Sequence, residues 1–132
     1  MLETRYSALF ELARLTDHAL GTLLDALTII DAQQLREFNI PLLYQSGVRY
    51  SHDGRDDPWR DALSTFAAMD GDCEDFACWR AAELQVRFGI QAWPCFVRKQ
   101  LAGGKQMIHV FVRLPGGRFE DPSRILGMHV NG

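Results

Sequence analysis

Residues 71–89 read GDCEDFACWRAAELQVRFG, and this stretch predicts the central element of the fold, a helix from Cys73 to Phe88. Its apolar residues recur at helical spacing and form one stripe, made of Cys73, Ala77, Ala81, Leu84 and Phe88. Asp72 is a natural N-cap, and Asp75, three residues later, completes a pattern like a capping box. Gly89 is expected to end the helix. The first turn, which carries Cys73, is therefore the best-specified part of this helix.

The residues after this helix have the pattern of strands. We expect strands over 91–99, 105–114 and 118–121, separated by the turn signals Gly103-Gly104 and Pro115-Gly116-Gly117. Strands joined by short turns form an antiparallel meander. Because helices come first and strands follow, without βαβ alternation, the sequence predicts an α+β domain in which the Cys73 helix packs on a small antiparallel sheet.

Helical spacing also runs from residue 2 to about residue 38. Thr16-Asp17 or Gly21 is expected to divide this stretch, and Asp31 is expected to cap a last short helix over 32–38. The leucine-rich face of these helices has two interpretations: it packs on its own domain, or it is a docking surface for a protein partner or a second copy of the chain. A small domain needs its apolar surface for its core, which favours packing.

The next segment reads as short elements. Residues 42–50 are predicted to be extended or a short helix, 51–58 a polar loop, and 58–69 a helix with Asp57 as its cap and Pro58 in its first turn. We expect a single domain over 1–132, with 1–40 as a helical N-terminal extension, 41–126 as the core and 127–132 as a C-terminal tail.

The composition is that of one folded domain: 132 residues, 47% hydrophobic and 23% charged. The net charge is −3 with dispersed Lys and Arg, which argues against nucleic-acid binding. No apolar run approaches the roughly 20 residues that cross a bilayer, and the first residues lack a secretory signal pattern, so we expect no membrane span and a cytoplasmic protein. Three cysteines, Cys73, Cys78 and Cys95, make a poor disulfide framework and suit a reducing compartment.

The candidate catalytic residues are Cys73, His109 and Asp121. The nucleophilic form of cysteine is the thiolate, and a helix N-terminus with a nearby imidazole lowers the pKa of a thiol. Glu74 and Asp75 place negative charge beside the sulfur and oppose thiolate formation, so His109 has to supply most of the activation.

The contact between His109 and Asp121 depends on one turn. The strand alternates, with Ile108, Val110, Val112 and Leu114 on one face and His109 on the other. If 115–117 is the hairpin loop, Leu114 pairs with Arg118, and Asp121 becomes the diagonal neighbour of His109 on the same face. A loop of two or four residues would turn Asp121 to the other face.

These residues resemble the transglutaminase-like cysteine protease superfamily, with the closest similarity to its compact bacterial and phage-encoded members. The resemblance covers about residues 48–125 and rests on Val48-Arg49-Tyr50, Trp59, the string GDCEDFA at 71–77, His109, and Phe119-Glu120-Asp121-Pro122-Ser123. It implies a papain-like α+β core with Cys73 as nucleophile, His109 as general base and acid, and Asp121 holding the imidazole. The implied activity is that of a cysteine hydrolase or acyltransferase acting on an amide bond of a peptide or protein through a thioester, with hydrolysis favoured.

Several points stay open at this stage. The backbone N–H of Cys73 is one oxyanion donor, and Tyr50 and Trp59 are candidates for the second. We expect no cofactor and no metal, because Cys73, Cys78, Cys95 and His109 lack the paired spacing of structural zinc ligands. The alternative interpretation is a non-catalytic structural or interaction protein that binds a partner through its N-terminal helices. For this alternative, the resemblance suggests a component of a phage particle.

Overall fold

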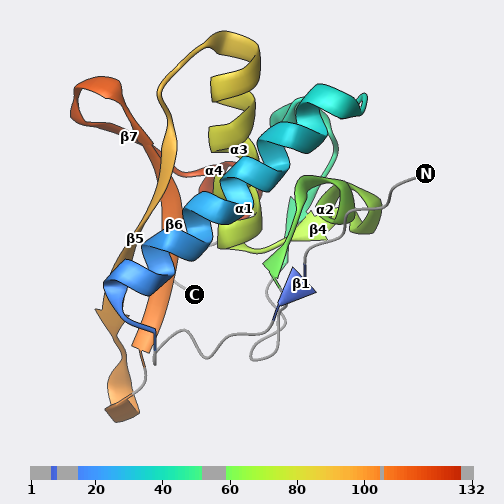
Figure 1. The fold of residues 1–132 in the computed structure, drawn as a ribbon. Coiled ribbons are helices and arrows are strands. Elements are labelled where there is room, and N and C mark those ends of the chain that lie inside the picture. Colours follow the sequence, from blue (N-terminus) through green and yellow to red (C-terminus); the bar gives the residue numbers. More distant parts are fainter. Residues whose placement is uncertain (1–6, 9–14, 52–58, 105, 129–132) are drawn as a thin grey trace.

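The computed structural model describes residues 7–8, 15–51, 59–104 and 106–128, and these form an α+β structure (Figure 1). The main elements are α1 (Asp17–Glu37), α2 (Ala62–Ala68), α3 (Cys73–Phe88), and the strands β5 (Trp93–Gln100), β6 (Gln106–Leu114) and β7 (Arg118–Glu120). The shorter elements are β1 (Ser7–Ala8), η2 (Leu43–Gln45), β2 (Arg49–Tyr50), β3 (Trp59–Arg60), β4 (Asp70–Gly71), η3 (Ala102–Gly104), η4 (Pro115–Gly117) and α4 (Pro122–Ile125).

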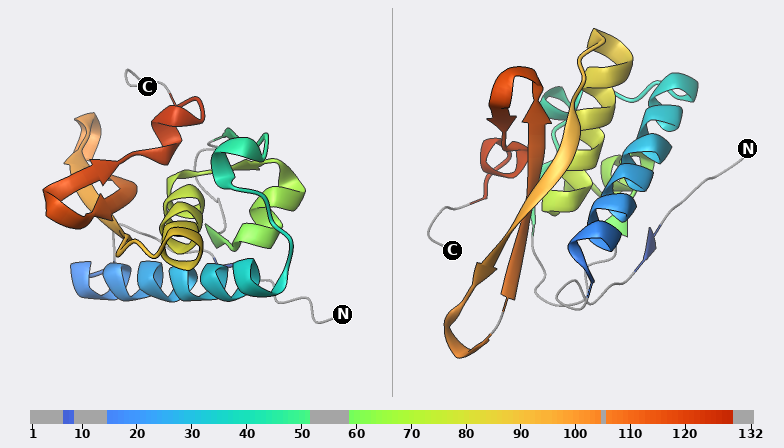
Figure 2. Two further views of the ribbon diagram at one scale, coloured as in Figure 1. Left: turned by 90° about the horizontal axis from the view of Figure 1, so that it is seen from above. Right: turned by 60° about the vertical axis from the view of Figure 1, so that its left-hand side comes forward.

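The helix α3 is the centre of the molecule. Figure 2 shows the β5-β6-β7 sheet on one side of α3, α2 on the other side, and α1 running alongside. The prediction of a central helix from Cys73 to Phe88 packed on an antiparallel meander is confirmed. Gly89 ends the helix with a left-handed φ of 65°, a conformation that glycine adopts at little cost.

The leucine-rich face of α1 belongs to the core. Leu20, Leu24 and Leu27 are fully buried, in one cluster with the apolar residues of α3 and with Val110 and Val112 of β6. Within α1, this finding supports packing on its own domain rather than a leucine-lined docking surface.

Two predictions for the N-terminal region are wrong. A boundary does lie at Thr16-Asp17, where Thr16 is the N-cap of α1, but the helix is continuous from Asp17 to Glu37, so neither Gly21 nor Asp31 interrupts it. A single glycine costs a helix only about 1 kcal/mol, which the burial of the neighbouring leucines exceeds. Ser7–Ala8, predicted to be helical, are a strand that pairs antiparallel with β3.

The predicted start of the next helix is also wrong, because α2 begins at Ala62 rather than at Pro58. Asp61 is its N-cap and accepts a hydrogen bond from Ser64 N at 2.8 Å. Asp31 of α1 accepts a second one from Ala62 N at 2.7 Å. The start of α2 is therefore specified partly by a side chain distant in sequence, and the predicted cap Asp57 lies outside the described residues.

All three cysteines are free thiols; Cys78 is fully buried, and Cys95 is partly buried. Within the described ranges, no helix combines the length and the apolar character needed to span a membrane.

Candidate active site

Cys73 is the first residue of α3, and three backbone contacts fix its position. Its N–H donates to Asp72 Oδ1 at 2.7 Å, and Asp72 N donates to Asp75 Oδ2 at 3.1 Å, which completes the predicted capping box. The other oxygen of Asp75 accepts from Arg60 N at 2.8 Å and so ties the helix start to β3. Cys73 is only 7% exposed and belongs to the core cluster, so its sulfur does not lie on the open surface.

His109 and Asp121 are in direct contact, with 2.8 Å between His109 Nε2 and Asp121 Oδ2. The predicted register is confirmed: η4 occupies residues 115–117, and Leu114 pairs with Arg118. Gly116 and Gly117 both have φ above +70°, so this turn needs its two glycines. Because Asp121 engages Nε2, Nδ1 is the ring nitrogen left for a proton transfer.

Two residues that the sequence analysis did not single out also contact this pair. The Phe111 ring stacks on the imidazole with 5.9 Å between centroids, and Arg124 Nε lies 3.4 Å from Asp121 Oδ2. Alternation along β6 places Phe111 beside His109 and was a usable signal, whereas no motif marks Arg124.

The Cys73 sulfur lies next to β6, beside the backbone on either side of His109. Its S–H donates to Glu74 Oε2 at 3.4 Å, and it lies 3.9 Å from the Ile108 carbonyl, while the Val110 N–H points toward the sulfur. Strand β7 pairs with residues 112–114 of β6 and not with the residues before them. The start of α3 can therefore lie against β6 near His109. Among the described residues, the hydrogen-bond partners of this thiol do not include His109. The structure thus joins His109 to Asp121 and places the thiol nearby without a bond to the imidazole.

The electrostatic environment keeps this thiol neutral. Burial raises the pKa of Cys73 well above its ordinary value, and the charges of Glu74 and Asp72 raise it further. Burial also raises the pKa of Glu74 and brings that of Asp75 to about 7. The structure therefore agrees with the expectation that Glu74 opposes thiolate formation, since its carboxylate accepts from the thiol and its charge raises the pKa of Cys73.

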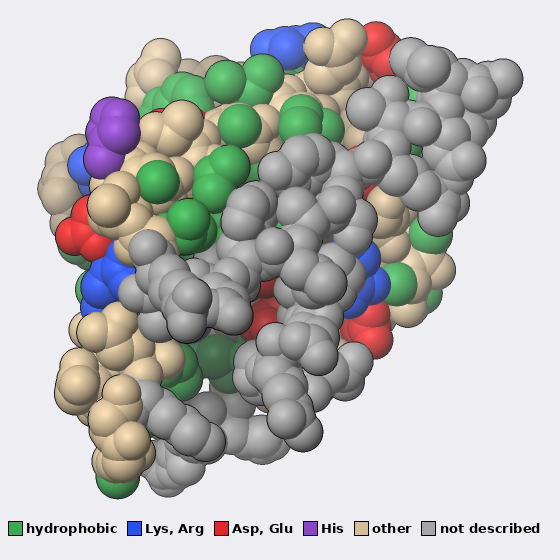
Figure 3. All heavy atoms as spheres, turned by 60° about the horizontal axis from the view of Figure 1, so that its bottom comes forward, with side chains coloured by type: hydrophobic (Ala, Val, Ile, Leu, Met, Phe, Trp, Pro, Cys, Tyr) green, Lys and Arg blue, Asp and Glu red, His purple; other side chains and the backbone are tan. Residues whose placement is uncertain are grey.

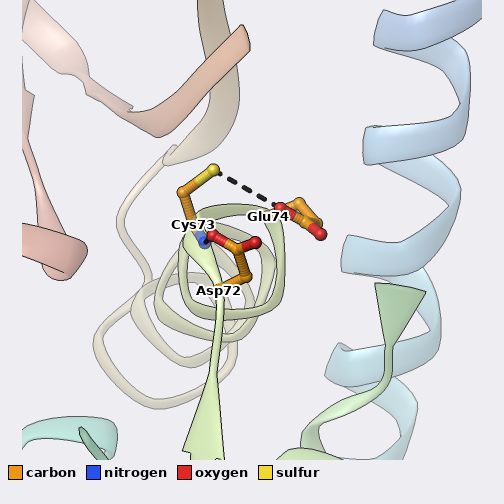
Figure 4. A group of neighbouring side chains, drawn as sticks. All are labelled: Asp72, Cys73 and Glu74. Atoms are coloured by element: carbon orange, nitrogen blue, oxygen red, sulfur yellow. Dashed lines mark hydrogen bonds between the residues drawn. The ribbon is translucent and has the colours of Figure 1, made fainter. Parts of the chain in front are cut away.

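Asp72, Cys73 and Glu74 are also the described residues with spacing suited to a metal ion, since their ligand atoms lie within 4.8 Å of one another (Figure 4). Two of these groups already have partners, because Asp72 Oδ1 accepts from Cys73 N and Glu74 accepts from the thiol. Figure 3 views the molecule from the side toward which the first turn of α3 points, and acidic side chains are visible there.

The chain was compared with protein-family models, with curated proteins and with solved structures, and none of the three comparisons found a match. Function must therefore be inferred from the geometry and chemistry of the site.

Proposed function

We propose that this protein catalyses acyl transfer from an amide of a peptide or protein to the Cys73 thiol and then to water, as the resemblance to transglutaminase-like cysteine proteases suggests. The observation that carries the proposal is the 2.8 Å contact between His109 Nε2 and Asp121 Oδ2, on the strand against which the Cys73 sulfur lies. An imidazole oriented by a carboxylate beside a thiol at a helix start is the arrangement that nucleophilic catalysis by cysteine requires.

The proposed reaction has two stages, formation of a thioester at Cys73 and its hydrolysis. His109 Nδ1 takes the thiol proton as the sulfur forms a bond to the carbonyl carbon, and the carbonyl π electrons move to the oxygen. Collapse of this intermediate restores the C=O bond and breaks the C–N bond, and His109 returns the proton to the leaving amine. Water then attacks the thioester with His109 as base, which releases the acid and regenerates the thiol. Asp121 holds the imidazole and stabilises its protonated form.

The neutral thiol determines which form of this mechanism applies. A stable thiolate–imidazolium pair does not suit a sulfur that is buried and bonded to Glu74. We therefore propose general-base catalysis, in which the thiol turns from Glu74 to His109 and loses its proton only as the substrate is attacked.

Acetylation of Cys73 by p-nitrophenyl acetate tests this proposal. The release of p-nitrophenolate gives the rate, and mass spectrometry locates the acetyl group. We expect Cys73 to be acetylated in the wild type, and His109→Gln to slow this step about 10²- to 10⁴-fold, the usual contribution of a general base. Cys95 is partly exposed and provides an internal control, which His109→Gln leaves unchanged.

The burial of Cys73 favours a second candidate function, a non-catalytic scaffold with the same fold. Equal acetylation rates at Cys73 in the wild type and in His109→Gln would support this alternative and refute the catalytic proposal.

A further inference from the structure

The Asp72 carboxylate brings together hydrogen-bonding groups from two elements, β2 and the first turn of α3. The backbone N–H of Cys73 donates to Asp72 Oδ1 at 2.7 Å, and the Tyr50 hydroxyl lies close enough to the same carboxylate to interact with it. Asp72 is only 7% exposed. The Asp72 carboxylate therefore sits directly beside the sulfur, where it accepts from the backbone N–H groups of Cys73 and Asp75 and lies against the Tyr50 hydroxyl.

The fold fixes Tyr50 in this position. Strand β2 pairs with β4 in parallel, with Tyr50 opposite Gly71, two residues before Cys73. The Tyr50 N–H donates to the Leu126 carbonyl at 2.9 Å, and its ring packs against Phe76 with 6.4 Å between centroids. The phenol is thus anchored through both its backbone and its ring, so its hydroxyl is preorganised at the start of α3.

Given the proposed function, on which this inference rests, we propose that Tyr50 is a further catalytic residue, which completes the oxyanion site of Cys73. The Tyr50 O–H and the Cys73 N–H are its two donors, and in the resting chain the Asp72 carboxylate occupies it. When the sulfur bonds to the carbonyl carbon and the π electrons move to oxygen, the Asp72 side chain rotates away and the new oxyanion takes its two donors. When the intermediate collapses, the electrons return to the C=O bond and the carboxylate returns to its place.

The environment of Tyr50 suits a permanent donor. Burial raises the pKa of Tyr50, and the neighbouring charges of Asp72, Cys73 and Glu74 raise it further. The phenol therefore keeps its proton at every pH at which the thiol and the imidazole can react.

Tyr50→Phe tests the proposal by separating two reactions of the same sulfur. Acetylation by p-nitrophenyl acetate passes through an oxyanion, whereas alkylation by iodoacetamide displaces iodide without one. We expect Tyr50→Phe to lower the rate of Cys73 acetylation about 10²-fold, the effect of losing one oxyanion donor. The alkylation rate should stay within about twofold, because thiolate formation depends on other groups.

Two further variants serve as controls for Tyr50→Phe. Tyr44→Phe removes the same hydroxyl from a tyrosine bonded to Glu120, and it should leave the acetylation rate unchanged. Asp72→Asn keeps an acceptor for the Cys73 N–H but removes the resident charge. It should raise the ratio of acetylation to alkylation about three- to tenfold, since a neutral acceptor holds its donors less strongly.

The outcomes distinguish this inference from the proposed function. If wild-type acetylation does not depend on His109, the proposed function fails and the oxyanion site fails with it. If it depends on His109 and Tyr50→Phe acetylates as fast as the wild type, only the role of Tyr50 is refuted. A fall of both rates in Tyr50→Phe would show a general disturbance of the site and would also overturn that role.

Discussion

Glu74→Gln is expected to make the Cys73 thiol more reactive. In the folded protein the thiol donates to Glu74 Oε2 at 3.4 Å, and both groups are buried. Glutamine has nearly the same shape as glutamate and keeps an acceptor oxygen, so the substitution removes charge with little change in packing. The change therefore isolates the electrostatic effect of Glu74 on the sulfur.

The magnitude follows from Coulomb's law. Two full charges 3.4 Å apart interact by about 5 kcal/mol at an effective dielectric constant of about 20. Burial raises the pKa of Glu74, which weakens the charge that the sulfur experiences, so this energy is an upper limit and we take about half of it. About 2.5 kcal/mol corresponds to roughly 70-fold more thiolate, and the lower nucleophilicity of a less basic sulfur reduces the gain in rate to about tenfold.

Iodoacetamide alkylation followed by mass spectrometry measures this effect, with Cys95 as the internal reference. Glu37→Gln is a suitable control, because Glu37 is exposed at the end of α1 and should not affect the rate. A Cys73 alkylation rate in Glu74→Gln equal to that of the wild type would refute the reasoning, because it would mean that Glu74 carries no charge that the sulfur experiences.

Two further predictions concern stability. Burial raises the pKa values of Glu74 and Asp75, the latter to about 7, so both groups bind protons more tightly in the folded than in the unfolded chain. The stability that they provide is complete below their unfolded pKa values near 4. It is lost as the pH rises through their folded pKa values. Thermal unfolding followed by circular dichroism should therefore give a higher midpoint at about pH 5 than at about pH 8, and the opposite order would contradict this account. Arg80→Met removes the cation that binds Glu120 at 2.6 Å and Glu83 at 2.8 Å. Because both carboxylates lose a partly buried partner, the free energy of unfolding measured with urea should fall by about 2–3 kcal/mol. A fall of less than about 0.5 kcal/mol would show that water replaces the guanidinium group.

The parts of the site that sequence could predict are those with local causes. The first turn of α3 is specified by Asp72 and Asp75 within four residues, and the His109–Asp121 register is set by a three-residue turn with two glycines. Such signals act over a few positions and can be read without the fold.

Long-range contacts explain what the sequence analysis missed. Asp31 was expected to cap a helix that begins at residue 32, because aspartate is a common N-cap. Its carboxylate instead caps α2, whose first N–H lies 31 residues further along the chain. Likewise, nothing local shows whether Glu74 faces solvent or the core, since that depends on where β6 passes the helix start.

A comparison of the three acidic residues at the start of α3 shows why Glu74 is the most informative of them. Asp72 caps the helix, and Asp75 binds the backbone N–H groups of Asp72 and Arg60, so both stabilise the fold through backbone contacts. Glu74 is just as buried, but its side chain accepts a hydrogen bond from the thiol. Burial of a carboxylate costs free energy, and this weak hydrogen bond compensates for little of it. If Glu74 controls the reactivity of Cys73 and does not stabilise the fold, Glu74→Gln should raise the midpoint of thermal unfolding near pH 8. The same substitution should also speed the alkylation of Cys73. Loss of stability in Glu74→Gln would instead show that Glu74 is a structural residue, and control of the thiol would then have to come from Asp72.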